Sequence, residues 1–156
     1  MAEQTRPALD DPAVREFLRL ERIAHLATAD AGGAPHNIPL CFWFDETSRF
    51  YFVIDEKPKR VAGVGIKRMR NIAANPRVAL VIDHYEEEWA FLAYVLISGE
   101  AAVVEDVNEY LLALRNLRDK YPQYRTMALS ADKNPIVRVE ARRVHAWGER
   151  FRRTTI

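Results

Sequence analysis

Apolar residues recur along this 156-residue chain with two periods, one helical and one typical of strands. Near the N-terminus, Val14, Phe17 and Leu18 repeat every three to four positions after Pro12, which predicts a helix that ends at Arg22. Alternating or continuous apolar runs then predict strands at residues 23–29, 36–44, 50–54, 77–85, 91–104 and 134–147. Helical spacing returns at residues 66–74 and 108–120.

Turn residues separate these strands and indicate where their pairing is interrupted. Pro39 favours an edge or bulge position for its strand, and Gly99 predicts a bulge or bend inside a long strand. The element order predicts a mostly β fold, with six or more antiparallel strands forming a small β-barrel and a few peripheral helices. We expect a flexible N-terminal arm at residues 1–10 and a single domain at residues 11–156.

The charge balance narrows the classes of function. The chain carries 23 Lys and Arg against 22 Asp and Glu, and a net charge of +1 argues against a surface that binds nucleic acid or anionic lipid throughout. No apolar run approaches the ~18 residues that a membrane helix needs. The N-terminus is charged and lacks the apolar stretch of a signal peptide. We therefore expect a cytoplasmic protein without a membrane or nucleic-acid partner.

Residues that usually bind metals or act as nucleophiles are few and scattered. Cys41 is the single cysteine, which excludes an intrachain disulfide and a four-cysteine zinc site. Its apolar surroundings favour a buried, inert thiol over a reactive one. The four histidines lack metal-ligand spacing: His25, His36, His84 and His145. We expect no metal site, and no catalytic residue is assigned.

Two further groups of side chains are open to more than one interpretation. Asp83 and the acidic run at residues 86–88 fit a solvated loop as well as a pair of acid/base carboxylates. Trp89 and Trp147 fit core, interface or stacking positions, and we expect the core because it is the usual place for tryptophan.

Positive charge is concentrated in residues 56–77, where seven Lys and Arg residues face one acid and give a local charge of +6. Within this segment, Lys67 and Arg68 stand near the start of the predicted short helix. The free N–H groups and the dipole of a helix N-terminus favour an anion there, and an arginine beside a lysine suits phosphate. The alternative is a solvated basic face, which is the usual role of a basic run.

A series of short blocks resembles a known superfamily. The blocks read IAHLAT at residues 23–28, GAPHNIP at 33–39, DEKPKR at 55–60, RMRNIAANP at 68–76, DHY at 83–85 with Trp89, and SGEA at 98–101. In this order they resemble the FMN-binding split barrels related to pyridoxamine 5′-phosphate oxidase, which include flavin and deazaflavin oxidoreductases. The resemblance covers about residues 13–147. It implies a split β-barrel that forms a homodimer, with the cofactor site at the interface.

The resemblance also implies roles for individual residues. The basic pair Lys67 and Arg68 would hold the cofactor phosphate, and the preceding segment, which includes Lys57, would add further contacts. Ile66 stands where many relatives carry serine. The strand after the glycine turn would lie along the isoalloxazine ring through His36, Asn37, Ile38 and Pro39. Trp89 or Trp147 would be an aromatic contribution from the partner subunit.

Within the superfamily, the blocks at residues 57–60, 71–76 and 83–89 are most similar to a subgroup of deazaflavin (coenzyme F-420)-dependent enzymes. The resemblance thus implies an oxidoreductase that uses F-420 or FMN for hydride transfer to or from a small organic substrate. One alternative is a non-catalytic module that binds FMN or haem. Another is a barrel that binds nucleic acid through the basic segment, although that segment lacks interleaved aromatic residues.

Overall fold

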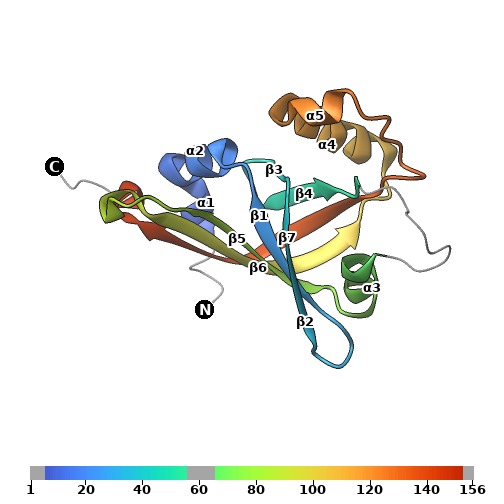
Figure 1. Ribbon diagram of the computed structural model, residues 1–156, viewed down its shortest axis with the longest axis horizontal. Coiled ribbons are helices and arrows are strands. Elements are labelled where there is room, and N and C mark those ends of the chain that lie inside the picture. Colours follow the sequence, from blue (N-terminus) through green and yellow to red (C-terminus); the bar gives the residue numbers. More distant parts are fainter. Residues whose placement is uncertain (1–5, 56–65, 153–156) are drawn as a thin grey trace.

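A computed structural model describes residues 6–55 and 66–152 of the chain, and in it seven antiparallel strands form one curled sheet (Figure 1). The order across the sheet is β2-β1-β5-β6-β7-β4-β3. The strands are β1 (Ala24–Ala29), β2 (Pro35–Leu40), β3 (Trp43–Phe44), β4 (Arg49–Val53), β5 (Arg77–His84), β6 (Ala93–Val103) and β7 (Ile136–Gly148). The predicted antiparallel split-barrel class is therefore confirmed.

Helices lie around the sheet (Figure 1). The α-helices are α1 (Arg6–Asp10), α2 (Pro12–Leu20), α3 (Lys67–Ala74), α4 (Val107–Lys120) and α5 (Pro122–Arg125), and two 3-10 turns are η1 (Trp89–Phe91) and η2 (Glu149–Phe151). Helix α1 falls within the segment expected to be a flexible arm, and its Leu9 side chain is buried in the core. None of the helices in the described ranges is both long and apolar enough to cross a bilayer.

The predicted strand at residues 36–44 is wrong in one respect, because it is divided into β2 and β3 by Cys41 and Phe42. The backbone of Phe42 bonds a side chain instead of a neighbouring strand. Its N–H donates to the Tyr121 hydroxyl at 3.0 Å, and the proton of that hydroxyl lies between the Arg22 carbonyl oxygen at 2.8 Å and the Phe42 carbonyl oxygen at 3.1 Å. The strand predicted at 91–104 likewise starts later, at Ala93, because residues 89–91 form the turn η1.

Strand β4 is buried on both faces, and this divides the core into two clusters. Phe50 and Phe52 point into the larger cluster, which lines the inside of the curled sheet and includes residues of α2. Tyr51 and Val53 point the opposite way, into a smaller cluster formed with α4 and α5. Alternating side chains on one strand thus attach the pair of helices to the outside of the sheet.

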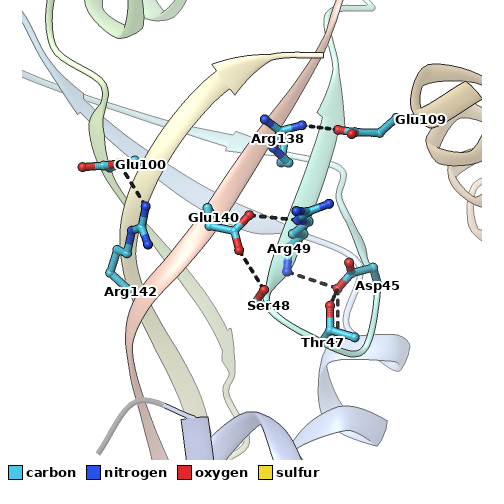
Figure 2. Close-up of polar contacts among 9 residues, drawn as sticks. All are labelled: Asp45, Thr47, Ser48, Arg49, Glu100, Glu109, Arg138, Glu140 and Arg142. Atoms are coloured by element: carbon cyan, nitrogen blue, oxygen red, sulfur yellow. Dashed lines mark hydrogen bonds and ion pairs between the residues drawn. The ribbon is translucent and has the colours of Figure 1, made fainter. Parts of the chain in front are cut away.

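Polar contacts reinforce this outer attachment (Figure 2). Glu140 on β7 accepts hydrogen bonds from Ser48 Oγ at 2.9 Å and Arg49 Nε at 2.9 Å, which connects β7 to β4. Arg138 on β7 pairs with Glu109 on α4, and both side chains are largely shielded from solvent. Exposed pairs contribute little to stability, so the shielded Arg138–Glu109 pair is the ion pair that adds most to the apolar packing of α4.

Gly99 lies at the predicted irregularity, where the β6–β7 register shifts between residues 98 and 99. The two backbones approach so closely that a Cβ on Gly99 would lie 2.1 Å from the Glu140 carbonyl oxygen. Because that neighbour is backbone in the centre of the sheet, it has no easy way to move aside. The position therefore requires glycine.

We expect Gly99→Ala to lower the free energy of unfolding by about 1–3 kcal/mol, as overpacking does. Gly32→Ala is the matched control, because its nearest atom, Asp30 Oδ1, lies at an ordinary 3.4 Å, and it should change stability little. Urea unfolding of both variants measures the difference. Equal stability of the two variants would contradict the role assigned to the close backbone approach.

Candidate functional site

The start of α3 presents two adjacent cations in different environments. Lys67 is the first residue of the helix, with its side chain 44% exposed, whereas Arg68 is buried and 6% exposed. Ile66 is the N-cap residue and makes no side-chain cap to the first turn. The Ile66 carbonyl accepts from the Met69 amide at 2.9 Å, and the helix N-terminus combines the amides that precede Met69 with one surface cation and one buried guanidinium.

The turn between β1 and β2 lies next to Lys67. The Asp30 carboxylate accepts hydrogen bonds from the Ala34 and Gly32 amides at 2.9 Å each, and its second oxygen lies 3.8 Å from Lys67 Nζ. The Ala34 hydrogen bond is the largest cause that holds the pKa of Asp30 below its usual value, and the charge of Lys67 contributes further. The hydrogen bonds of the turn and the nearby Lys67 therefore both favour the carboxylate form of Asp30.

A buried hydrogen bond fixes α3 against the sheet. Asn71 Nδ2 donates to Thr28 Oγ1 at 3.0 Å, and both residues are buried, at 1% and 3% exposed. Sequence reasoning missed this pair. The available signal was that Asn71 shares a helix face with Arg68 and Ile72, so a polar side chain stood where the helix packs. Because Asn71 is one turn beyond Arg68, this bond also sets where the basic pair lies.

The four candidate positions on β2 alternate between two environments. His36 and Ile38 are half-buried, and Asn37 and Pro39 are exposed. His36 pairs with Thr28 in the register of β1 and β2, which places it beside the residue that holds α3. Its Nδ1 atom is buried and makes no hydrogen bond to the residues that the structure describes. The structure thus brings His36 close to the α3 attachment, with a polar atom that has no partner in this part of the chain.

Other candidate residues do not join this group. Lys57 lies outside the described residues, as do Lys59 and Arg60 of the basic segment. Trp89 and Trp147 are 73% and 45% exposed, so the expectation that they are core residues is wrong. Their positions explain the exposure, because Trp89 is in a surface turn and Trp147 faces outward next to Tyr94, with ring centroids 5.6 Å apart.

The two tryptophans share a groove of about 400 Å³ at the far end of the sheet from α3. Helix α3 precedes the start of β5, whereas Trp89 follows its end. The eight residues of β5 span about 26 Å at ~3.3 Å per residue. Within one chain, therefore, neither tryptophan reaches Lys67. They could approach such a site only from a second copy.

The described residues offer no assembled set of catalytic groups. Burial is the largest cause that raises the pKa of the Cys41 thiol, which agrees with an inert cysteine. Of the acidic cluster, Glu86 bonds His84 Nε2 at 2.7 Å, and the cluster is exposed. Within residues 6–55 and 66–152, no three histidine, cysteine or acidic side chains gather as a metal-ion site. The arrangement at the start of α3 is suited to binding and orienting an anionic group.

Comparison with known proteins agrees with this fold. The family model described as pyridoxamine 5′-phosphate oxidase matches residues 10–148. A curated reductase of 5a,11a-dehydrotetracycline and 5a,11a-dehydrooxytetracycline from Streptomyces rimosus is 28% identical over 133 residues, which cover 85% of this chain and 78% of that protein.

Two solved structures of other proteins share this fold. The haem storage protein HutZ from Vibrio cholerae aligns with a TM-score of 0.66 and 16% identity, over 88% of this chain and 96% of that one. An FAD-binding protein from Mesorhizobium loti aligns with a TM-score of 0.64 and 19% identity, over 89% and 92% of the two chains. At these identities the likeness concerns the fold.

Removing the acceptor that holds α3 should destabilise the protein. We expect Thr28→Val to lower the free energy of unfolding by about 1–3 kcal/mol, because the buried Asn71 amide loses its partner. Thr28→Ser keeps the hydroxyl and should retain more of the stability. Chemical denaturation measures both variants, and a Thr28→Val protein as stable as the wild type would contradict the role of this hydrogen bond.

Proposed function

The chain belongs to the pyridoxamine 5′-phosphate oxidase family, and we propose that it is an oxidoreductase that binds coenzyme F-420 or FMN and acts on a small organic substrate. The observation that carries the proposal is the basic first turn of α3, held against the β1–β2 hairpin by Asn71 and Thr28. When bound, either cofactor supplies hydride transfer. The reductase from Streptomyces rimosus, similar over most of this chain, supports an oxidoreductase.

The cofactor phosphate is proposed to bind at the N-terminus of α3. Lys67 supplies a mobile point charge, and Arg68 supplies a guanidinium that its burial holds in place. Backbone N–H groups of the first turn add donors that point out of the helix end. Asp30 lies 3.8 Å from Lys67 and orients the amine without enclosing it, since the lysine side chain stays 44% exposed. These groups fit a phosphate in charge and in donor number.

The flat ring of the cofactor is proposed to lie along β2. This strand is at the edge of the seven-stranded sheet, so one side of its backbone is unpaired within the described fold. The buried Nδ1 atom of His36 has no partner among the described residues and fits a polar atom of a ring system. Ile38, two residues along on the same face, packs on the core and gives the site an apolar floor.

The residues of this chain would bind and orient the cofactor, and they would not transfer protons. The cofactor would carry the reactive atoms, and Lys67, Arg68 and His36 would fix its position relative to the substrate. Exclusion of water requires a cover, which we propose a second copy of the chain supplies. The exposed aromatic groove with Trp89 and Trp147 supports this assembly, because large apolar side chains exposed together mark interaction surfaces.

A non-catalytic module that binds FMN or haem is the second candidate. Its support is the likeness of the fold to the haem storage protein from Vibrio cholerae. Such a module would hold its ligand without redox turnover. An F-420 or FMN complex that no substrate reduces or reoxidises would favour this candidate.

Titration of the purified protein with F-420, FMN and haem, followed by fluorescence quenching or absorbance, tests the proposed function. We expect Lys67→Ala to weaken F-420 or FMN binding about tenfold, since a charge-assisted hydrogen bond contributes about 1.5–3 kcal/mol and this lysine is partly exposed. Lys133→Ala removes an exposed lysine elsewhere and should leave the Kd unchanged. Binding of haem alone, or equal Kd values for the two variants, would overturn the proposed site.

Light scattering after size-exclusion chromatography tests the proposed assembly. We expect a mass of twice the 18.0 kDa of the chain. The double change Trp89→Ser and Trp147→Ser should shift this mass toward the monomer and weaken cofactor binding together. Leu112→Ser is the control, because it removes a similarly exposed apolar side chain from α4. A wild-type monomer that binds cofactor fully would contradict the shared site.

A further inference from the structure

The turn between β1 and β2 places a carboxylate beside the proposed phosphate site. Asp30 follows directly after β1, and Lys67 is the first residue of α3. Asp30 Oδ2 lies 3.8 Å from Lys67 Nζ, and within residues 6–55 and 66–152 Asp30 is the acid that pairs with this lysine. A site proposed to bind an anion therefore contains a negative charge of its own, which repels the ligand while it orients the lysine.

Hydrogen bonds of the turn hold Asp30 in place. Its Oδ1 atom accepts from the Gly32 and Ala34 amides at 2.9 Å each. Its backbone N–H donates to the Ala34 carbonyl at 3.1 Å, and its carbonyl accepts from the Gly33 amide at 3.0 Å. Any movement of the carboxylate away from Lys67 would disturb these bonds. The negative charge therefore has a fixed position relative to the start of α3.

The two carboxylate oxygens of Asp30 have separate tasks. Oδ1 accepts the two amide bonds that close the turn, and the amide oxygen of an asparagine can accept the same bonds. Oδ2 is the atom that pairs with Lys67. The turn thus requires an oxygen at this position but does not require a charge. The charge of Asp30 is available to act on a ligand that binds to Lys67.

The surroundings of Asp30 favour its charged form. The hydrogen bond from Ala34 is the largest cause that lowers the pKa of this carboxyl, and the Gly32 amide and the charge of Lys67 lower it further, against a smaller desolvation effect. The side chain is 37% exposed. Its interaction with a nearby ligand charge is therefore moderate, and salt screens it.

Phosphate groups of two kinds differ in their charge. A phosphate monoester has a second ionisation with a pKa of about 6, so it carries about 1.5 to 2 negative charges at pH 7. A phosphodiester lacks this second ionisation and carries one negative charge. FMN ends in a phosphate monoester, whereas F-420 carries its phosphate as a diester within its side chain.

The charges at the start of α3 match a phosphodiester. Lys67 and Arg68 supply two positive charges and Asp30 supplies one negative charge, so these three groups together hold one net positive charge. A diester neutralises this charge. A monoester brings a second negative charge close to Asp30, and the repulsion between like charges grows in proportion to the charge of the ligand.

We propose that Asp30 is a specificity-determining residue, which makes the start of α3 favour a singly charged phosphodiester over a doubly charged phosphate monoester. The inference rests on the proposed function and narrows it, because it favours F-420 over FMN. Lys67 and Arg68 attract both kinds of phosphate, and Asp30 offsets the advantage that their positive charge would give to the monoester.

Three ligands with the same ring test the proposal. Riboflavin has no phosphate, riboflavin 5′-(methyl phosphate) is a diester, and FMN is a monoester. Fluorescence quenching at pH 7.5 measures the Kd of each ligand for the full-length wild type and for Asp30→Asn, which keeps the acceptor of the turn. We expect Asp30→Asn to bind FMN about tenfold more tightly and the methyl ester about threefold more tightly, with riboflavin unchanged, because the effect follows the charge of the ligand. F-420 should respond as the methyl ester does.

Asp10→Asn is the matched control, because it removes the same charge from α1, where the side chain is 74% exposed. It should leave every Kd unchanged. In about 1 M salt, where the Debye length is about 3 Å, the effect of Asp30→Asn should largely disappear. Equal gains for FMN and the methyl ester in Asp30→Asn, or no gain for either, would overturn the proposal.

The same measurements separate this inference from the proposed function. If the wild type binds the phosphorylated ligands and Lys67→Ala weakens their binding, but Asp30→Asn leaves the ratio of the FMN and methyl ester Kd values unchanged, the inference alone fails. If the wild type binds neither F-420 nor any of the flavins, the proposed function fails and the inference fails with it. Thermal unfolding of Asp30→Asn near the wild-type temperature shows that the turn is intact.

Discussion

Burial of both faces of β4 is the constraint on which the rest of the structure depends. Phe50 and Phe52 complete the core inside the curled sheet, while Tyr51 and Val53 form the base on which α4 and α5 pack. Because side chains of one short strand belong to both clusters, α4 and α5 pack directly on the sheet. Their attachment brings Tyr121 to the backbone of Phe42 and Lys120 to the Phe42 ring.

The candidate cofactor site lies away from β4, at the start of α3 and along β2. The buried hydrogen bond from Asn71 to Thr28 and the packing of Ile72 in the core hold α3 against the sheet, and the β1–β2 turn provides Asp30 beside Lys67. β2 is an edge strand, so this region is open on one side. We propose that the open edge beside the first turn of α3 receives a cofactor and that a second copy covers it with the aromatic groove at the far end of its own sheet.

Lys67 and Lys120 show that the same side-chain type can lie in two different electrostatic environments. Lys67 is partly exposed and lies close to a carboxylate, and a lysine point charge in this position suits phosphate. Lys120 is largely buried and lies near Arg22, and burial first and this like charge second lower the pKa of its amine to about 7. Water and counter-charge at one site, and their replacement by apolar atoms at the other, account for the difference.

The sequence by itself determined the order and type of the main elements, because apolar periodicity is a local property that nearby residues encode. It also located Lys67 and Arg68 at a helix start and the irregularity at Gly99. Only the tertiary structure decided the break between β2 and β3, the Asn71–Thr28 bond, the exposure of Trp89 and Trp147, and the burial of the Lys120 amine. Each of these depends on residues tens of positions apart, or on which surfaces the closed fold leaves uncovered. Such contacts arise when the sheet curls and the helices pack, so the local pattern of apolar residues does not predict them.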